Sequence, residues 1–285
     1  MTELEQLLAI LTLEQVDRNL FTGTSPERPR RIFGGQVLAQ ALRAAQRTVA
    51  PGLLAHSMHA YFLRPGDPKR QILFEVEATR DGRSFSTRRV VARQNAVPIF
   101  STTVSFQYPE EGLAHQSSMP QVAEPESLES EVEFWEKMQK EHAGRFPAPM
   151  AKAIDCRPVE RRDYLNPHPG EPVQHSWLRI DGTLADDAAL HQALLAFLSD
   201  FVLLGAALLP HPYTAYEPRM QVASLDHALW FHRPCRVDDY LLYAMDSPTA
   251  SGGRGLSRGQ FFDRSGVLLA STAQESLLRL RPATG

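Results

Sequence analysis

One acidic side chain lies within the most apolar segment of the chain. Residues 193–209 read ALLAFLSDFVLLGAALL and hold Asp200 near their centre. A carboxylate in such a helix is costly unless it is hydrogen-bonded or lies at an opening. If Asp200 faces a cleft, partial desolvation raises its pKa and suits it to act as a general base. The alternative is structural, because Ser199 and Asp200 both favour N-caps and could break the helix or cap a new one.

Several histidines and a cysteine are further candidates for chemistry. His56 and His59 are expected to share one face of a strand, where structural histidines are commoner than catalytic ones, and His56 is kept as a secondary candidate. His227, His232 and Cys235 invite a metal site. Their gaps of five and three residues on one extended strand do not converge on a metal, so we expect no metal site.

The elements that must position these residues occur twice along the chain. Residues 60–65 resemble residues 229–234, residues 81–86 resemble 252–257, and residues 99–102 resemble 269–272. The separations are 169, 171 and 170 residues. Three matches in one order at nearly one spacing indicate a diverged duplication.

Each half contains a helix followed by strands. The first half predicts a helix over 34–47 and strands over 57–63, 71–80, 84–94 and 97–108. The second half predicts strand 175–180, helix 187–209 and strands 223–232, 240–247, 253–263 and 267–279. Between the halves, residues 109–155 are acidic and rich in proline, with one helix predicted over 127–142. This order predicts an α+β fold in which a sheet wraps one buried helix in each half.

The second half departs from the first at two polar positions. Alignment of the two helices by their apolar pattern puts Asp200 opposite Gly34 and Gly35, where the first half has no acid. The spacing of 170 puts Gln274 opposite Val104. A glutamine that replaces a valine in a half-buried strand needs a hydrogen-bond partner.

Composition excludes several classes of protein. The 285 residues are 43% hydrophobic and 22% charged, which is typical of a folded protein. A net charge of −3 without a basic stripe argues against nucleic-acid binding. Two cysteines cannot build a disulfide framework, and the acidic, amphipathic N-terminus does not read as a signal peptide. Asp200 in the apolar segment argues against a membrane span, so we expect a cytoplasmic protein.

The ordered motifs of both halves resemble the type II acyl-CoA thioesterases. They are FGGQVLAQA at 33–41, HSMH at 56–59, FLRPGD at 62–67, SLDHALWFHRP at 224–234 and STAQE at 271–275. The match covers nearly the whole chain, from about residue 7 to residue 281, and is weakest in the middle. The resemblance implies a double hotdog fold, in which two repeats form one continuous antiparallel sheet. It divides the chain into an N-terminal repeat (1–110), a linker region (111–174) and a C-terminal repeat (175–285) that carries the catalytic residues.

The resemblance also implies a reaction and its residues. Fatty acyl-CoA is hydrolysed to free fatty acid and CoA by an activated water, with no metal, no cofactor and no covalent acyl-enzyme. The catalytic acid of the family corresponds to Asp200, its hydroxyl to Ser224 and its amide to Gln274. Ser224 takes the place where several bacterial members have threonine. A serine keeps the hydroxyl for hydrogen bonding but has a less constrained rotamer.

Substrate contacts are less sharply indicated. The backbone N–H groups of Gly34 and Gly35 could approach the thioester, although tight helix–strand packing explains the pair equally well. The anionic CoA must meet basic residues, for which Arg64 and Arg83 are candidates, as are Arg88 and Arg89.

Two other functions stay open. One is an acyl-CoA hydratase or dehydratase, since one fold hosts several reactions. In those enzymes an aspartate and a histidine usually occur together on the helix, whereas Asp200 is followed by FVLLG. The other is a non-catalytic acyl-CoA-binding protein. Exposed sheet edges and the resemblance favour a homo-oligomer, either a dimer or a tetramer of double hotdogs.

Overall fold

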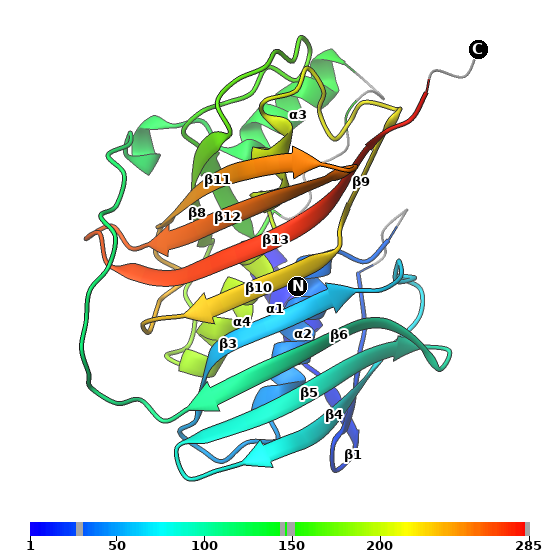
Figure 1. Ribbon diagram of the computed structural model, residues 1–285, viewed down its shortest axis with the longest axis vertical. Helices are drawn as coiled ribbons and strands as arrows, with labels where there is room; N and C mark the ends of the chain where they lie inside the picture. Colours follow the sequence, from blue (N-terminus) through cyan, green and yellow to red (C-terminus); the bar gives the residue numbers. More distant parts are fainter. Residues whose placement is uncertain (27–30, 143–145, 147–151, 283–285) are drawn as a thin grey trace.

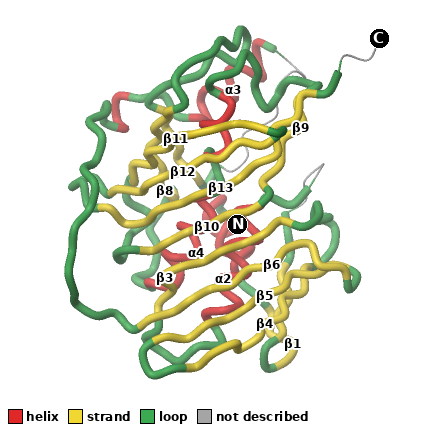
Figure 2. Tube along the Cα trace, viewed as in Figure 1, coloured by secondary structure: helices red, strands yellow, loops and turns green. Residues whose placement is uncertain are grey.

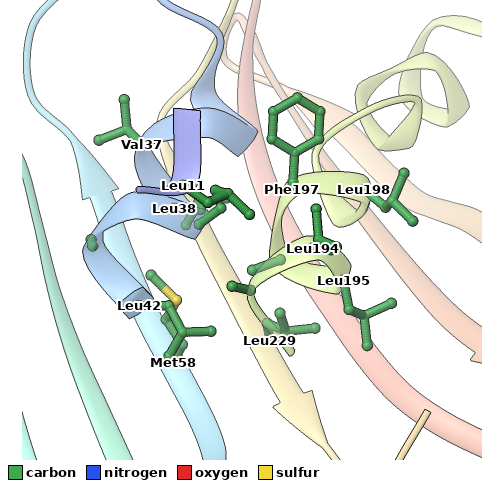
Figure 3. Packing of buried hydrophobic residues seen from close by; sticks show 14 of the residues in the cluster. Leu11, Val37, Leu38, Leu42, Met58, Leu194, Leu195, Phe197, Leu198 and Leu229 are labelled. Carbon is green, nitrogen blue, oxygen red and sulfur yellow. The ribbon is translucent and has the colours of Figure 1, made fainter. Parts of the chain in front are cut away.

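Two helices lie side by side behind one large sheet (Figure 1). The computed structural model describes residues 1–26, 31–142, 146 and 152–282. The central helices are α2 (Gly34–Gln46) and α4 (Ala188–Ser199). They run antiparallel, because the Gln46 side chain at the end of α2 donates to the carbonyl of Ala189 at the start of α4. Figure 3 shows leucines of both helices packed together, with Met58 and Leu229 of the overlying strands beside them.

The sheet joins both halves of the chain and all of its strand pairs are antiparallel. Its strands are β1 (Glu14–Asp17), β2 (Leu20–Gly23), β3 (Leu54–Phe62), β4 (Ile72–Asp81), β5 (Phe85–Gln94), β6 (Val97–Gln107), β7 (Ile154–Pro158), β8 (Val173–Ile180), β9 (Met220–Ser224), β10 (Asp226–Phe231), β11 (Leu241–Ser251), β12 (Arg254–Phe262) and β13 (Leu268–Leu280). Their order is β1-β2-β4-β5-β6-β3-β10-β13-β12-β11-β8-β7, with β9 paired to β13. This order reads the same way outward from the β3–β10 junction, so the two halves are related units, as the repeat predicts (Figure 2).

Local sequence explains why these segments form these elements. Buried and exposed residues alternate along β5, β6, β12 and β13, as expected for strands with one face on the core. Helix α4 starts at Asp187, whose carboxylate accepts from the N–H groups of Ala189 and Leu190. Helix α2 follows Phe33, which supplies no side-chain cap, so its first N–H groups must find partners elsewhere.

The single helix predicted over residues 187–209 is wrong. Helix α4 ends at Ser199, and after a bend the chain forms a 3-10 helix, η2 (Leu203–Leu208). The segment Ala188–Leu208 is apolar and long enough to cross a membrane, but 61% of its most apolar stretch of 18 residues is buried inside the protein. The strand predicted over 223–232 is also divided, because β9 ends at Ser224 and β10 begins at Asp226.

The helices and the strands of the two halves have different spacings. The N-caps Phe33 and Asp187 are 154 residues apart, and the C-caps Arg47 and Asp200 are 153 apart. The predicted alignment of Asp200 with Gly34 and Gly35 is therefore wrong, because Asp200 corresponds to Arg47 at the end of the helix. The chain between α4 and the next strands is longer in the second half, which restores the spacing of about 170 in the strands.

The structure adds elements that the sequence prediction did not assign. They are α1 (Glu3–Leu11), β1, β2 and β7. Strand β7 lies within the predicted linker region 111–174 and pairs with β8, with Ile154 and Cys156 buried. That region also contains a 3-10 turn, η1 (Pro125–Ser127), and helix α3 (Glu131–Glu141), which begins four residues later than predicted.

The crossing of α2 and α4 requires a glycine at position 35. A Cβ there would collide with the carbonyl oxygen of Phe197 and lie 2.5 Å from the Phe33 ring. We expect Gly35→Ala to lower the free energy of unfolding by about 1–3 kcal/mol, because it overpacks a rigid contact. Urea denaturation measures this change. Gly112→Ala is the matched control, since its Cβ would meet nothing within 4 Å, and an equal loss in both variants would contradict the steric explanation.

Candidate active site

Asp200 lies at the end of α4, where the helix is stopped by short-range hydrogen bonds. The residue is the C-cap, and its N–H donates to the carbonyl of Leu198. The N–H of Phe201 donates to the same carbonyl, at 3.0 Å. The hydroxyl of Tyr243 donates to the carbonyl of Ser199 at 2.9 Å and so occupies an acceptor that a continuing helix would use. The side chain of Asp200 therefore extends from the end of a helix, and the residue is only 9% exposed.

Three groups donate hydrogen bonds to the Asp200 carboxylate or to its partner. Ser224, the last residue of β9, donates from its hydroxyl to Asp200 Oδ1 at 3.2 Å. Gln274 on β13 donates from Nε2 to Ser224 Oγ at 3.1 Å and to Ser276 Oγ at 3.2 Å, and it lowers the pKa of the carboxylate. The backbone N–H of Gly35 in the first turn of α2 is a further donor to the carboxylate. The structure thus brings together the three predicted catalytic residues, which lie on three different elements.

Burial dominates the electrostatics of this carboxylate. Desolvation raises the pKa of Asp200 from 3.8 to about 7, although the bonds from Ser224, Gly35 and Gln274 act in the opposite direction. At neutral pH the group is therefore divided between its acid and its base form.

Gly34 and Gly35 also lie at this site. A Cβ on Gly34 would lie 2.6 Å from Asp200 Oδ2, so a side chain there would displace the carboxylate. Because α2 has no side-chain cap of its own, the carboxylate of the second half takes the place of an N-cap for the helix of the first half.

The other predicted binding residues are spread along the sheet. Arg64 follows β3 by two residues, and a Cβ on Gly34 would lie 3.0 Å from the ring of Phe62 at the end of that strand. Arg64 is exposed and donates to the carbonyl of Pro98. His56 lies six residues before Phe62, about 20 Å along the strand. It contacts Ser105 Oγ at 2.7 Å and packs against Phe85, close to the exposed turn that holds Arg83. His56 and Arg83 are thus remote from Asp200.

The arginines considered for CoA binding and a histidine considered for a metal site have other partners within the protein. Arg88 is buried and bonds Asp81 and the carbonyl of Thr48, so it cannot meet CoA phosphates as predicted. Arg89 is exposed beside Glu77. His232 lies 2.8 Å from the hydroxyl of Ser271.

Sequence reasoning missed two residues of the site. Arg31 lowers the pKa of Asp200 electrostatically and donates to the carbonyl of Val222. His227 is buried and its Nδ1 lies 2.6 Å from Oε1 of Gln274. The repeat contained a signal for His227, because the strand spacing of 169 puts it opposite Met58, an apolar residue.

The raised pKa of Asp200 predicts a pH-dependent stability. Its pKa is higher in the folded state, at about 7, than the unfolded value of about 3.8, so the folded protein holds this proton more tightly. That stabilisation is complete below the unfolded pKa and is lost as the pH rises through 7. We expect the stability of the native protein relative to Asp200→Asn to fall by roughly 2–3 kcal/mol between pH 5 and pH 8.

Urea denaturation of both proteins at the two pH values measures this difference. Other titrating groups cancel, since both proteins share them. A difference that is independent of pH would show that Asp200 ionises with an ordinary pKa.

Comparison with known proteins agrees with this geometry. Residues 24–107 match the family model described as the acyl-CoA thioesterase N-terminal domain, and residues 148–277 match the model described as acyl-CoA thioesterase. The chain is 41% identical to acyl-CoA thioesterase 2 of Haemophilus influenzae, over 97% of this chain and 98% of that protein. It is 40% identical to acyl-coenzyme A thioesterase 8 of Homo sapiens, over 96% of this chain and 88% of the human protein.

Solved structures give the same result for the fold. A crystal structure of an acyl-CoA thioesterase II from Mycobacterium marinum is 42% identical, with a TM-score of 0.80 over 96% of this chain and 98% of that one. A related protein from Mycobacterium avium is 33% identical, with a TM-score of 0.79 over 97% and 99% of the two chains. The predicted α+β double hotdog fold is confirmed, and the chain belongs to the acyl-CoA thioesterase family of thioester hydrolases.

Proposed function

We propose that this chain hydrolyses fatty acyl-CoA to free fatty acid and CoA, with a water that Asp200 activates. The observation that carries the proposal is a buried carboxylate with a pKa of about 7 that accepts hydrogen bonds from Ser224, Gln274 and Gly35. A general base works best when its pKa lies near the operating pH. The family supplies the substrate class, because its curated members are named acyl-CoA thioesterases.

The reaction needs no group beyond these side chains and a water. Asp200 takes a proton from the water as its oxygen attacks the thioester carbonyl carbon. The tetrahedral oxyanion then collapses, the C–S bond breaks, and the thiolate of CoA takes the proton back from Asp200. Ser224 and Gln274 hold the carboxylate, and their remaining hydrogen-bonding capacity holds the water in line for attack.

The start of α2 is the candidate for binding the carbonyl oxygen. Its first N–H groups point out of the helix, and the positive end of the helix dipole stabilises developing negative charge. The N–H of Gly35 bonds Asp200, and the N–H of Gly34, the first residue of the helix, is the proposed donor for the oxyanion. The absence of a Cβ on Gly34 lets the Asp200 carboxylate lie against the start of the helix, because a Cβ there would be 2.6 Å from Asp200 Oδ2.

CoA phosphates are proposed to meet Arg64. Its guanidinium is exposed and lies two residues after the end of β3, where a Cβ on Gly34 would lie 3.0 Å from the ring of Phe62. Arg83 and His56 lie near the other end of that strand and are not included in this proposal. The predicted cytoplasmic location and the predicted dimer or tetramer stay predictions.

Replacement of Asp200 tests the reaction directly. We expect Asp200→Asn to fold and to lose at least about a hundredfold in kcat, since a missing general base typically costs that much. The measurement is thiol release from a saturated acyl-CoA in the presence of a thiol reagent. Near-native rates with several acyl-CoAs would rule out Asp200 as the base.

The same protein is incubated with an enoyl-CoA while the conjugated double bond is followed. Hydration without thiol release would identify a hydratase, and saturable binding without either reaction would identify a binding protein. Gln116→Ala, which removes hydrogen bonds to the carbonyl of Gly266 and from the N–H of Leu268, is the control variant for handling and folding.

The pH dependence of the rate is a separate prediction. The base form of Asp200 is required, so kcat is expected to rise with pH and level off above an apparent pKa of about 7. His227 stays neutral across this range, since burial lowers its pKa to about 4, so it adds no second titration to the curve of kcat against pH. A rate that is flat from pH 5 to pH 9 would contradict a buried carboxylate as the base.

A further inference from the structure

We infer that His227 is a positioning residue for the reaction, which orients the Gln274 amide and ties it to the end of the helix that carries Asp200. The inference rests on the proposed function. His227 lies on β10, where it is only 1% exposed, and it contacts Gln274 of the site. Its two ring nitrogens have different partners, Gln274 and Ser199.

The contact with Gln274 defines which way the amide points. His227 Nδ1 lies 2.6 Å from Gln274 Oε1, and an amide oxygen can only accept, so Nδ1 carries the proton. The amide nitrogen of Gln274 is thereby directed toward Ser224 Oγ, at 3.1 Å, and Ser276 Oγ, at 3.2 Å, on the side of the carboxylate whose pKa it lowers. With the amide reversed, its nitrogen would face the Nδ1 proton and its oxygen would face Asp200, where like partial charges repel.

The contact with Ser199 connects the same histidine to the end of α4. The hydroxyl of Ser199 lies 2.8 Å from His227 Nε2, which has no proton when Nδ1 is protonated, and 2.9 Å from the carbonyl of Ala196, so these two acceptors share its one proton. Ser199 is the residue before Asp200, and Tyr243 holds its carbonyl. The hydrogen bonds from His227 to Gln274, from Gln274 to Ser224 and from Ser224 to the Asp200 carboxylate thus run in one direction.

The fold itself does not require a histidine at this position. In the first half, the corresponding strand position holds Met58, and the position that corresponds to Gln274 holds Val104, directly opposite Met58. Both are fully buried apolar residues. The polar pair therefore replaces an apolar pair in the half that carries the acid, which is expected if the pair serves that acid.

Two substitutions separate the contacts of His227. His227→Asn keeps a donor near the position of Nδ1 and gives up the contact with Ser199, whereas His227→Gln reaches toward Ser199 and gives up Gln274. We expect kcat to stay within about threefold in His227→Asn and to fall roughly ten- to hundredfold in His227→Gln, with KM little changed in both.

The matched control is His191→Asn. His191 is also buried, on the same helix as Ser199, and its Nδ1 accepts from the N–H of Val237. The change removes a similar volume from the core but leaves the Asp200 network in place. Thermal unfolding shows how far each variant is destabilised, and only His227→Gln is expected to lose turnover beyond the control.

The dependence of kcat on pH distinguishes a positioning role from a loss of packing, because lost packing alone does not shift the pKa of Asp200. The bonds from Ser224 and Gln274 lower the pKa of Asp200, so a disoriented amide is expected to move the rising limb of the kcat profile to higher pH. The shift is expected in His227→Gln and not in His191→Asn. An unshifted limb in His227→Gln overturns the inference.

A double-mutant cycle with Gln274→Leu distinguishes this inference from the proposed function. If His227 acts through Gln274, His227→Gln lowers kcat no further once Gln274 is replaced. An equal loss in both backgrounds overturns the positioning role of His227 and leaves the proposed reaction standing. Full activity in Asp200→Asn and Gln274→Leu alone would instead overturn the proposed site.

Discussion

The contact between the Asp200 carboxylate and the first turn of α2 is the interaction on which the site depends. It joins the end of one central helix to the start of the other, and so joins the two halves of the chain. The helix start gains an acceptor that its own sequence lacks. The carboxylate gains a donor but loses its hydration, and the net effect is a pKa near neutrality. One contact therefore serves both the packing of the core and the tuning of the base.

The two halves use one template in different ways. In the first half the buried positions on the strands hold Met58, Val104 and Arg88, and the guanidinium of Arg88 bonds the carbonyl of Thr48 just after α2. In the second half the matching positions hold His227, Gln274 and Ser257, with Gln274 opposite Ser257. The first set closes the end of its helix with a fixed cation. In the second set an acid lies at the helix end with hydrogen-bond donors around it, and Ser224 takes the strand position that Ala55 holds in the first half.

Much of the fold could be predicted from the sequence because the strands alternate and the repeat fixes their spacing. The end of α4 could not, since the apolar residues continue through Asp200 to Leu209 and the signal to stop comes from Tyr243, far along the chain. Asp200 was identified from its apolar surroundings, while Ser224 and Gln274 needed the family resemblance as well. His227 was considered only as a metal ligand, a role that the sequence analysis rejected, because its actual partners are set by tertiary packing. Short elements such as β1, β2 and β7 carry too few residues for a periodic pattern.

The joining of the halves in one chain also fixes their stoichiometry. Gly35 comes from one half and Asp200 from the other, so the site exists only where unlike halves meet. If the halves were separate chains with similar sheet edges, two identical halves could also pair. Such pairs would carry two catalytic acids or none. A covalent connection removes those combinations. Every folded molecule then carries one complete set of site groups. The second copy of the repeat can therefore diverge from the first, since no molecules are lost to pairs of identical halves.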